Sequence, residues 1–451
     1  MADTSTRKSR TERLQDDSVS RRSFLGAAAG AAAFAVVPSH VLGANGSAPS
    51  NKLNIAVIGV RGRGGANLNG VKSENIVALC DVDEKRLADA AKDFPKAETY
   101  VDWRKCVDQK NLDAVVCSTT DHTHAFVSTW AMNRGLHVYC EKPLARTVEE
   151  ARTVRETYLK NRDKLATQMG TQIHASNNFR RMVELVRSGA IGTPQEAHVW
   201  CSRSPENGSY LPDKGPAPDH LNWDLWNGPT QYHPYNPGYV PGCLKWNKYW
   251  DFGAGQIGDM GSHMIDMAYW AFDLGLPTTC EAEGSPVHSD TCPTWLKAKW
   301  DHPANDWRPA IKLHWYDGGK KPKLPGPLDE KDLFKGALFK GDKGYLLADY
   351  GYRLLLPRGD MTQYESPDED DLIPSSPGHH REWIIGCKTG KPTLCNFDYS
   401  GRLIENNLLS LVAYRTGDKL QWSANNLKAA NCPEADKFVR ETYRDGWVLN
   451  G

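Results

Sequence analysis

The stretch LNIAVIGVRGRGG, residues 53–65, decides the fold of this 451-residue chain. Its first half is a continuous apolar run, which is typical of a strand buried on both faces of a sheet. The glycines that follow, Gly59, Gly62 and Gly64, allow a sharp turn and a close approach of the backbone to a bound group. A helix that begins after such a turn offers its N-terminus to a pyrophosphate. The stretch therefore predicts the opening of a Rossmann fold.

Asp81 follows the second apolar run, IVALC at 76–80. An acidic side chain about 20 residues beyond the glycine turn bonds the adenosine ribose hydroxyls in such folds. This carboxylate would repel a 2′-phosphate, so it favours NAD as the cofactor. Arg61, Arg63 and Arg86 leave NADP open. The alternative role for Asp81 is to cap the helix that follows it.

Apolar runs and helical patterns alternate as far as about residue 175. The predicted strands are 53–59, 76–80, 113–118, 137–140 and 165–169, and the predicted helices are 83–94, 123–134 and 147–159. Strands that are apolar throughout and alternate with helices indicate a doubly wound parallel sheet. We therefore expect an α/β fold whose Rossmann domain occupies 51–175.

A second domain is expected over 176–451, where the rhythm changes. Its predicted helices are 178–188, 259–272, 380–387, 403–414 and 433–443, and its strands include 196–202, 310–316 and a hairpin at 336–349. The stretch 212–249 is rich in Pro, Gly, Trp and Tyr and predicts a long ordered loop.

Residues 1–50 are typical of an export signal. Arg21 and Arg22, followed by Phe24 and Leu25, precede an apolar stretch that ends near Val37. That stretch is shorter than the roughly 20 residues of a membrane span. Paired arginines in this place indicate the twin-arginine export machinery as a partner and an exported, periplasmic location. Because this route carries folded proteins, an exported enzyme of this kind would retain its cofactor.

The bulk composition excludes some partners. Fifty-five basic and 55 acidic residues give a formal net charge of zero, so nothing favours nucleic acid. Eleven cysteines form no CxxC pair and no metal-ligand spacing, so no metal is expected. Disulfides are open but not indicated.

Three segments carry candidate chemistry. STTDHTH at 118–124 follows the fourth strand, at the edge of the sheet where open α/β folds bind ligands. The alternative role for His122 and His124 is to cap the next helix or to pack there. Glu141-Lys142-Pro143 follows the fifth strand, and proline fixes the direction in which the chain leaves it. Lys142 would then stabilise negative charge on a substrate oxygen, unless it is a surface lysine.

The third segment is GDMGSHMID at 258–266. Asp259 and His263 are four residues apart, so on a helix they share one face. A histidine suits the removal of a hydroxyl proton near neutral pH, and a carboxylate one turn away would fix its tautomer. In the alternative interpretation, Asp259 caps the helix and His263 packs in the core.

Together these segments resemble the Gfo/Idh/MocA family of oxidoreductases. The resemblance covers 53–447 and implies a second domain with an open, mostly antiparallel sheet that supports a homo-oligomer, a dimer or tetramer. It assigns catalysis to Lys142, Asp259 and His263. It implies that the cofactor contacts are Gly59, Gly62, Gly64, Asp81, Thr119, His124 and Glu141. Arg61 departs from the glycine pattern, which affects the details of pyrophosphate binding.

The resulting expectation is an NAD(P)-dependent oxidoreductase acting on a secondary alcohol of a sugar, polyol or sugar derivative. Aromatic residues in the loop before the catalytic helix are candidates for stacking on the sugar: Trp223, Trp226, Tyr235 and Trp246. Two alternatives stay open. One is an NAD-dependent glycoside hydrolase or lyase that oxidises the sugar transiently, and the other is a non-catalytic cofactor-binding protein.

Overall fold

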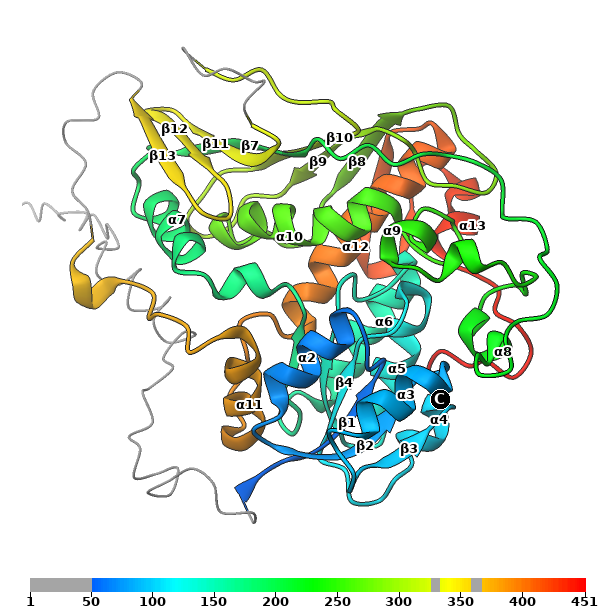
Figure 1. Ribbon diagram of the computed structural model, residues 1–451. Helices are drawn as coiled ribbons and strands as arrows, with labels where there is room; N and C mark the ends of the chain where they lie inside the picture. The colour runs from blue at the N-terminus through cyan, green and yellow to red at the C-terminus, as the bar shows by residue number, and fades with distance from the viewer. Residues whose placement is uncertain (1–50, 326–332, 358–366) are drawn as a thin grey trace, which may run out of the picture.

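The computed structural model describes residues 51–325, 333–357 and 367–451. The predicted export signal lies outside these residues. Within them, no helix combines the length and the hydropathy needed to cross a membrane. Figure 1 shows two sheets, one built from the first part of the described chain and one from the rest, with helices between and around them.

The first sheet is parallel, with strand order β3-β2-β1-β4-β5-β6. Its strands are β1 (Asn54–Ile58), β2 (Asn75–Cys80), β3 (Glu98–Tyr100), β4 (Ala114–Cys117), β5 (His137–Cys140) and β6 (Thr167–Met169). Its helices are α2 (Arg63–Val71), α3 (Glu84–Ala91), α4 (Trp103–Cys106), α5 (Asp121–Asn133) and α6 (Val148–Asn161). The order reverses between β1 and β4, which is the point where such sheets bind ligands at their carboxyl edge. This confirms the predicted Rossmann architecture.

The second sheet has nine strands in the order β13-β12-β11-β7-β10-β9-β8-β14-β15. They are β7 (Pro194–Cys201), β8 (Thr279–Gly284), β9 (Leu296–His302), β10 (Ile311–Asp317), β11 (Lys335–Gly341), β12 (Gly344–Ala348), β13 (Arg353–Pro357), β14 (Leu420–Ser423) and β15 (Lys428–Ala429). Neighbouring strands are antiparallel except for β7 and β10. The predicted open, mostly antiparallel sheet is confirmed.

Helices cover one face of the second sheet (Figure 1). They are α7 (Asn177–Arg187), α10 (Gly255–Ala271) and α12 (Phe397–Thr416). Along β9, buried residues alternate with half-buried ones, as expected when only one face of a strand is covered. α10 is buried along its whole length. Its polar side chains must therefore hydrogen-bond to other buried groups or face a cavity.

Four predicted elements differ from those observed. α12 begins at Phe397, six residues before the predicted start at 403. α10 begins at Gly255 rather than Asp259, because the positive φ of 59° at Gly255 starts the helix one turn earlier. The stretch 212–249 is not only loop. It contains α8 (Trp223–Asn227), the 3₁₀ turn η3 (Pro237–Tyr239) and α9 (Cys243–Trp246).

The last predicted helix, 433–443, is also shorter than expected. It is reduced to η7 (Pro433–Ala435) and α13 (Asp436–Val439), because Arg440 is extended. From there the tail runs back to the first sheet, where the indole of Trp130 on α5 donates to the carbonyl of Val448 at 2.8 Å. α11 (His379–Thr389) likewise packs against α2. The division at residues 175 and 176 stays a prediction.

Candidate active site

A cavity of about 1310 Å³ lies at the carboxyl edge of the first sheet and extends to α10. Most of the residues singled out from the sequence line it. They are Gly59, Gly62, Asp81, Thr119, His124, Glu141, Lys142, Asp259 and His263, with Trp226, Tyr235 and Trp246. Gly64 lies behind the cavity in the first turn of α2. The volume of the cavity suits a dinucleotide together with a small second ligand, because pockets for a single ligand span roughly 300–1,000 Å³.

The glycine turn after β1 is as tight as the sequence predicts. A Cβ atom on Gly59 would lie 2.4 Å from the carbonyl oxygen of Ser118, and one on Gly64 would lie 1.9 Å from the carbonyl oxygen of Gly59. Gly62 has a φ of 60° and occupies the N-cap of α2. Only glycine fits these places, so the turn leaves a backbone cradle at the helix N-terminus for a pyrophosphate. Arg61 also lines the cavity, and its guanidinium lies 3.3 Å from Asp89.

Asp81 lies at the end of β2 with its carboxylate on the cavity wall. It accepts hydrogen bonds from the backbone of Val60 at 3.1 Å and of Asp83 at 3.0 Å. Asp83, not Asp81, caps α3, so the alternative role for Asp81 as helix cap is wrong. Burial raises the pKa of Asp81. Arg86 lies 3.2 Å from Asp83, so this arginine is already paired.

Glu141 is held beneath the cavity by two amides. Its Oε1 accepts from Asn67 at 2.9 Å and from Gln172 at 2.8 Å. A Cβ atom on Gly170 would lie 2.7 Å from its carboxyl carbon. Burial raises the pKa of Glu141. This cluster fixes the chain just before Lys142. Asn67 and Gln172 had no sequence signal, since single amides occur in every element.

The two histidines of the 118–124 segment are both buried. His124 joins the loops after β4 and β5, with Nδ1 2.7 Å from the carbonyl oxygen of Pro143 and Nε2 3.1 Å from that of Thr119. Burial lowers its pKa to about 4. His122 packs below the cavity with Nε2 2.9 Å from the carbonyl oxygen of Trp226. The packing alternative therefore describes His122.

Lys142 and Arg203 share the carboxylate of Asp259. The ammonium of Lys142 contacts Oδ1, and Nη1 of Arg203 lies 2.6 Å from Oδ2. The predicted hydrogen bond by which Asp259 would orient His263 is wrong for this structure. The two side chains share a face of α10, but the two cations reach the carboxylate from other elements. Nδ1 of His263 lies instead 3.3 Å from the hydroxyl oxygen of Thr171.

Thr171 determines which nitrogen of His263 is available. Its hydroxyl also lies 3.4 Å from the carbonyl oxygen of Ser262, to which it can only donate. The hydroxyl oxygen then accepts from the Nδ1–H of His263. This tautomer leaves the lone pair on Nε2, and His263 lines the cavity.

The charges of the cluster follow from its burial and its pairing. Burial alone would raise the pKa of Asp259. The positive charges of Lys142 and Arg203 lower this pKa by more than burial raises it, so it lies below its ordinary value. Burial lowers the pKa of Lys142, but Asp259 more than compensates, so it lies above its ordinary value. Burial, followed by the charge of Lys142, lowers the pKa of His263 to about 3. Near neutral pH the site therefore holds an ion pair beside an uncharged imidazole.

Asp121 and Arg203 are further residues of the site that the sequence analysis did not select. Burial raises the pKa of Asp121 well above its ordinary value. The positive charge of Lys142 acts in the opposite direction but does not cancel this rise. Arg203 directly follows the predicted strand 196–202 and lies two residues beyond Cys201, the end of β7. A basic residue at the end of a buried strand was the available signal. Lys335 and Tyr350 also line the cavity.

The aromatic residues before α10 form a cluster of their own. Trp223 lies outside the cavity and stacks on Trp226, with ring centroids 4.4 Å apart and planes 9° apart. Trp226, Tyr235 and Trp246 reach the cavity wall, although Trp226 and Trp246 are 8% and 7% exposed. Stacking of these rings on a sugar stays a prediction.

Among the described residues, three groups of His, Cys, Asp and Glu side chains bring their ligand atoms within 4.8 Å of one another. Only the group Glu196, His198 and His314 lies on the second sheet. There Glu196 already accepts from the ammonium of Lys340 at 2.7 Å. All eleven cysteines, which fall in the described part of the chain, are free thiols, and only Cys243 is exposed.

Two family descriptions match the chain. "Oxidoreductase family, NAD-binding Rossmann fold" of Gfo/Idh/MocA matches residues 53–169, and "Oxidoreductase family, C-terminal alpha/beta domain" matches 178–305. Together they cover more than half of the chain. The region that carries the glycine turn, Asp81 and Lys142 is thus an NAD-binding Rossmann fold.

Curated relatives cover only part of the chain. Inositol 2-dehydrogenase of Salmonella typhimurium is 30% identical over 131 residues, which are 29% of this chain and 39% of that protein. Levoglucosan dehydrogenase of Pseudarthrobacter phenanthrenivorans is 28% identical over 261 residues, or 56% of this chain and 53% of that protein. The chain therefore spans about half or less of these relatives.

Solved structures share the fold over most of the chain. The WlbA dehydrogenase from Bordetella pertussis in complex with NADH and UDP-GlcNAcA has a TM-score of 0.57 at 15% identity, over 82% of this chain and 99% of that chain. Levoglucosan dehydrogenase in complex with NADH and levoglucosan has a TM-score of 0.53 at 16% identity, over 82% and 98%.

Proposed function

Because this chain belongs to the Gfo/Idh/MocA family of oxidoreductases, we propose that it oxidises a secondary alcohol of a sugar, polyol or sugar derivative with NAD. One observation carries the proposal. The glycine cradle and Asp81 line the same cavity as Lys142 and His263. The cofactor cradle and a paired cation with a neutral base thus face one cavity.

The residues present fit NAD. A Cβ atom on Gly59 or Gly64 would clash with the backbone of this turn, whereas one on Gly62 would meet open space at the N-terminus of α2. A helix N-terminus suits a pyrophosphate, and the carboxylate of Asp81 suits a ribose diol. Bound NAD supplies a hydride acceptor. Thr119 and Glu141 line the part of the cavity between this cradle and Lys142.

His263 acts as the base that removes the hydroxyl proton. Its Nε2 carries the lone pair, and its low pKa keeps it uncharged at neutral pH. An imidazole of such low basicity needs an alcohol whose own proton is weakened. Lys142 does this, because its ammonium, kept charged by Asp259, lowers the free energy of an alkoxide beside it. Asp259 and Arg203 position Lys142.

The test is a panel of sugars and polyols, including myo-inositol and levoglucosan, on which the named relatives act. Purified protein, NAD and each compound are followed by the absorbance of reduced nicotinamide. We expect formation of NADH with at least one polyhydroxylated compound and none with its deoxy analogue at the oxidised carbon. Absence of NADH formation across the panel, with NAD bound, would count against a dehydrogenase.

We also propose that residues 1–50 direct export by the twin-arginine machinery. Support comes from the order Arg21-Arg22, Phe24-Leu25 and the apolar stretch that follows. The compartment that an exported enzyme reaches does not regenerate free nicotinamide cofactor. The enzyme would therefore retain its cofactor through each catalytic cycle.

A homo-oligomer, dimer or tetramer, is the last part of the proposal. Helices cover one face of the nine-stranded sheet, and the other face carries half-buried side chains such as His198, His314 and Tyr316. Half-buried rings on an open sheet favour a second copy over solvent. Light scattering during size-exclusion chromatography measures the mass directly.

A further inference from the structure

A second cavity, of about 290 Å³, lies apart from the NAD cavity. Segments that are far apart in the sequence line it: the chain before α6, the chain before α10, the end of α12, and α13 with the residues after it, together with Tyr210 and Ser289. Its size is at the lower limit for ligand pockets, so it suits only a small ligand.

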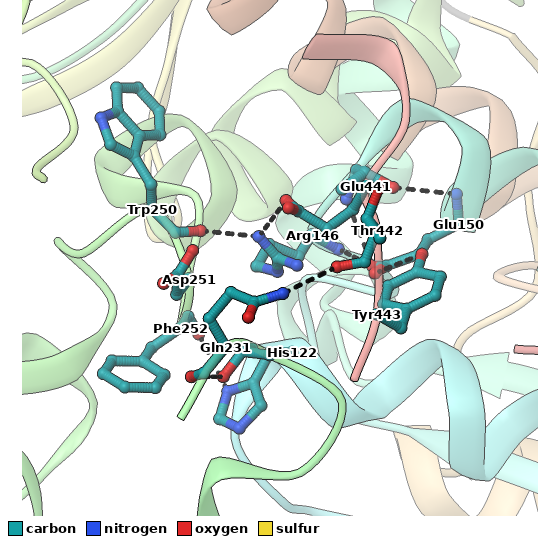
Figure 2. Close-up of polar contacts among 12 residues, drawn as sticks. His122, Arg146, Glu150, Gln231, Trp250, Asp251, Phe252, Glu441, Thr442 and Tyr443 are labelled. Atoms are coloured by element: carbon teal, nitrogen blue, oxygen red, sulfur yellow. Dashed lines mark hydrogen bonds and ion pairs between the residues drawn. The ribbon is translucent and has the colours of Figure 1, made fainter. Parts of the chain in front are cut away.

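Arg146 at the base of this cavity is buried but only partly paired (Figure 2). Its side chain is 4% exposed. Nη1 donates to the carbonyl oxygen of Trp250 at 2.8 Å and to the carboxylate of Glu441 at 3.0 Å. Nε and Nη2 are buried and have no hydrogen-bond partner. Buried donors of a charged group are almost always satisfied, so two unpaired donors on a residue that lines a cavity indicate a missing acceptor.

Arg415 is a second guanidinium on the wall of the same cavity. It lies 4.7 Å over the ring of Trp250 and 4.0 Å over the ring of Phe438. Among the described residues, no carboxylate lies within ion-pair distance of it. Rings that cover the faces of a guanidinium leave its N–H edge for hydrogen bonds, and that edge matches an oxyanion.

The carboxylates of the cavity wall are already engaged. Asp251 accepts from Nε2 of His233 at 2.6 Å, and Glu441 pairs with Arg146. The other cations of the wall are Lys437 and Arg440, of which Arg440 pairs with Glu149 and Asp436. Among the described residues, the cationic groups with donors left without an acceptor are Arg146, Arg415 and Lys437, whose ammonium lies 4.8 Å from the centre of the Phe438 ring. The cavity thus presents cationic donors in excess of acceptors.

We propose that this second cavity binds a small oxyanion of the phosphate or sulfate type between Arg146 and Arg415. The anion accepts from the unpaired donors of Arg146 and from the edge of Arg415. Trp250 belongs to the chain that leads into α10, and Arg146 to the chain that follows Lys142. A bound oxyanion therefore ties together the two segments that deliver the catalytic side chains.

The test is a titration of the full chain with inorganic phosphate, followed by the thermal unfolding midpoint. The protein is saturated with NAD, so that the pyrophosphate cradle is occupied, and chloride at matched ionic strength is the control. We expect a saturable rise of the midpoint with phosphate and none with chloride. Glucose 6-phosphate is titrated in parallel. If glucose 6-phosphate binds more tightly than inorganic phosphate, the oxyanion belongs to a phosphate monoester. If glucose 6-phosphate binds more weakly, the ligand is the free ion.

Arg415→Gln should weaken phosphate binding at least about tenfold, which corresponds to roughly 1.4 kcal/mol. The matched control is Arg402→Gln on the same helix, since Arg402 pairs with Asp398 away from the cavity. Equal phosphate affinity in Arg415→Gln and in wild-type protein overturns the proposal. So does an absence of saturable binding to wild-type protein.

A second measurement needs no variant. Wild-type crystals grown with NAD and soaked in selenate should give an anomalous difference peak between Arg146 and Arg415. A peak elsewhere, or none, overturns the proposal even if Arg415→Gln fails to fold.

Discussion

The guanidinium of Arg203 donates to the carboxylate of Asp259, with Nη1 2.6 Å from Oδ2. Arg203 lies beyond the end of β7, and Asp259 lies on α10, so the pair joins the second sheet to the helix that carries His263. Lys142 contacts the other carboxylate oxygen from the first sheet. One carboxylate thus fixes the relative positions of three segments at the cavity.

Arg203→Gln tests this positioning role. The variant leaves Asp259 with Lys142 as its only cationic partner, so Lys142 is held more tightly and further from the substrate oxygen. Hydrogen bonds to charged groups contribute about 1.5–3 kcal/mol, so kcat should fall by roughly 10- to 100-fold. The affinity for NAD should not change. The control is Arg155→Gln, which breaks a pair with Asp398 of similar length, 2.7 Å, outside the cavity. An unchanged kcat in Arg203→Gln would remove the residue from the site.

The pH profile tests the charge state of His263. Burial lowers its pKa to about 3, against an ordinary value of about 6.5, so the imidazole stays neutral as the pH falls through 6.5. The activity that depends on the neutral imidazole is present at every pH above the pKa of His263 in the folded protein. It is lost only as the pH falls towards that pKa. We expect kcat/KM to show no loss near pH 6.5. A steep acid limb centred there would contradict the buried, neutral base.

Asp81→Ala tests the assignment of the cofactor. Without the carboxylate, the ribose diol loses its acceptor, and a 2′-phosphate is no longer repelled. NAD should bind more weakly, and its advantage over NADP should narrow. Binding is measured by fluorescence titration with each reduced cofactor. Tighter binding of NADP than NAD by wild-type protein would contradict the role of Asp81.

Cofactor retention follows from the proposed export. Protein purified without added nucleotide should carry near-stoichiometric NAD(H), detected by mass spectrometry after denaturation. Replacing Arg21-Arg22 by Lys-Lys should leave loaded protein in the cytoplasm, as cell fractionation reports. An empty cavity in gently purified protein, with fast exchange of added NAD, would argue against retention.

The sequence predicted best where burial leaves a continuous pattern. Residues 55–58 of β1 and all of β4 are 0–1% exposed, and their apolar runs predicted the strands and the carboxyl edge at which the cavity lies. β3 was missed because its three residues are exposed or half-buried at the edge of the sheet, so it carries no apolar run. The start of α10 was misplaced because a glycine with positive φ begins it.

Pairings between distant segments could not be predicted in this way. Helical spacing placed Asp259 and His263 on one face, but it does not reveal that Arg203, 56 residues away, binds the carboxylate. Thr171 is 92 residues from His263. The second cavity joins Arg146 to Glu441 across 295 residues. Such contacts depend on how the two sheets pack, which periodicity does not encode.

A dehydrogenase of this kind transfers a hydride from a carbon atom of its substrate to NAD, and isotope transfer measures that step. The protein is incubated with NAD and a perdeuterated form of a sugar or polyol that supports NADH formation, and the nicotinamide is analysed by mass spectrometry. Wild-type protein should yield NADH with one deuterium. His263→Ala should yield it roughly 10²–10⁴-fold more slowly while still binding NAD, as expected for loss of a general base. Reduced nicotinamide without deuterium, or equal rates in the two proteins, would contradict this account of the site.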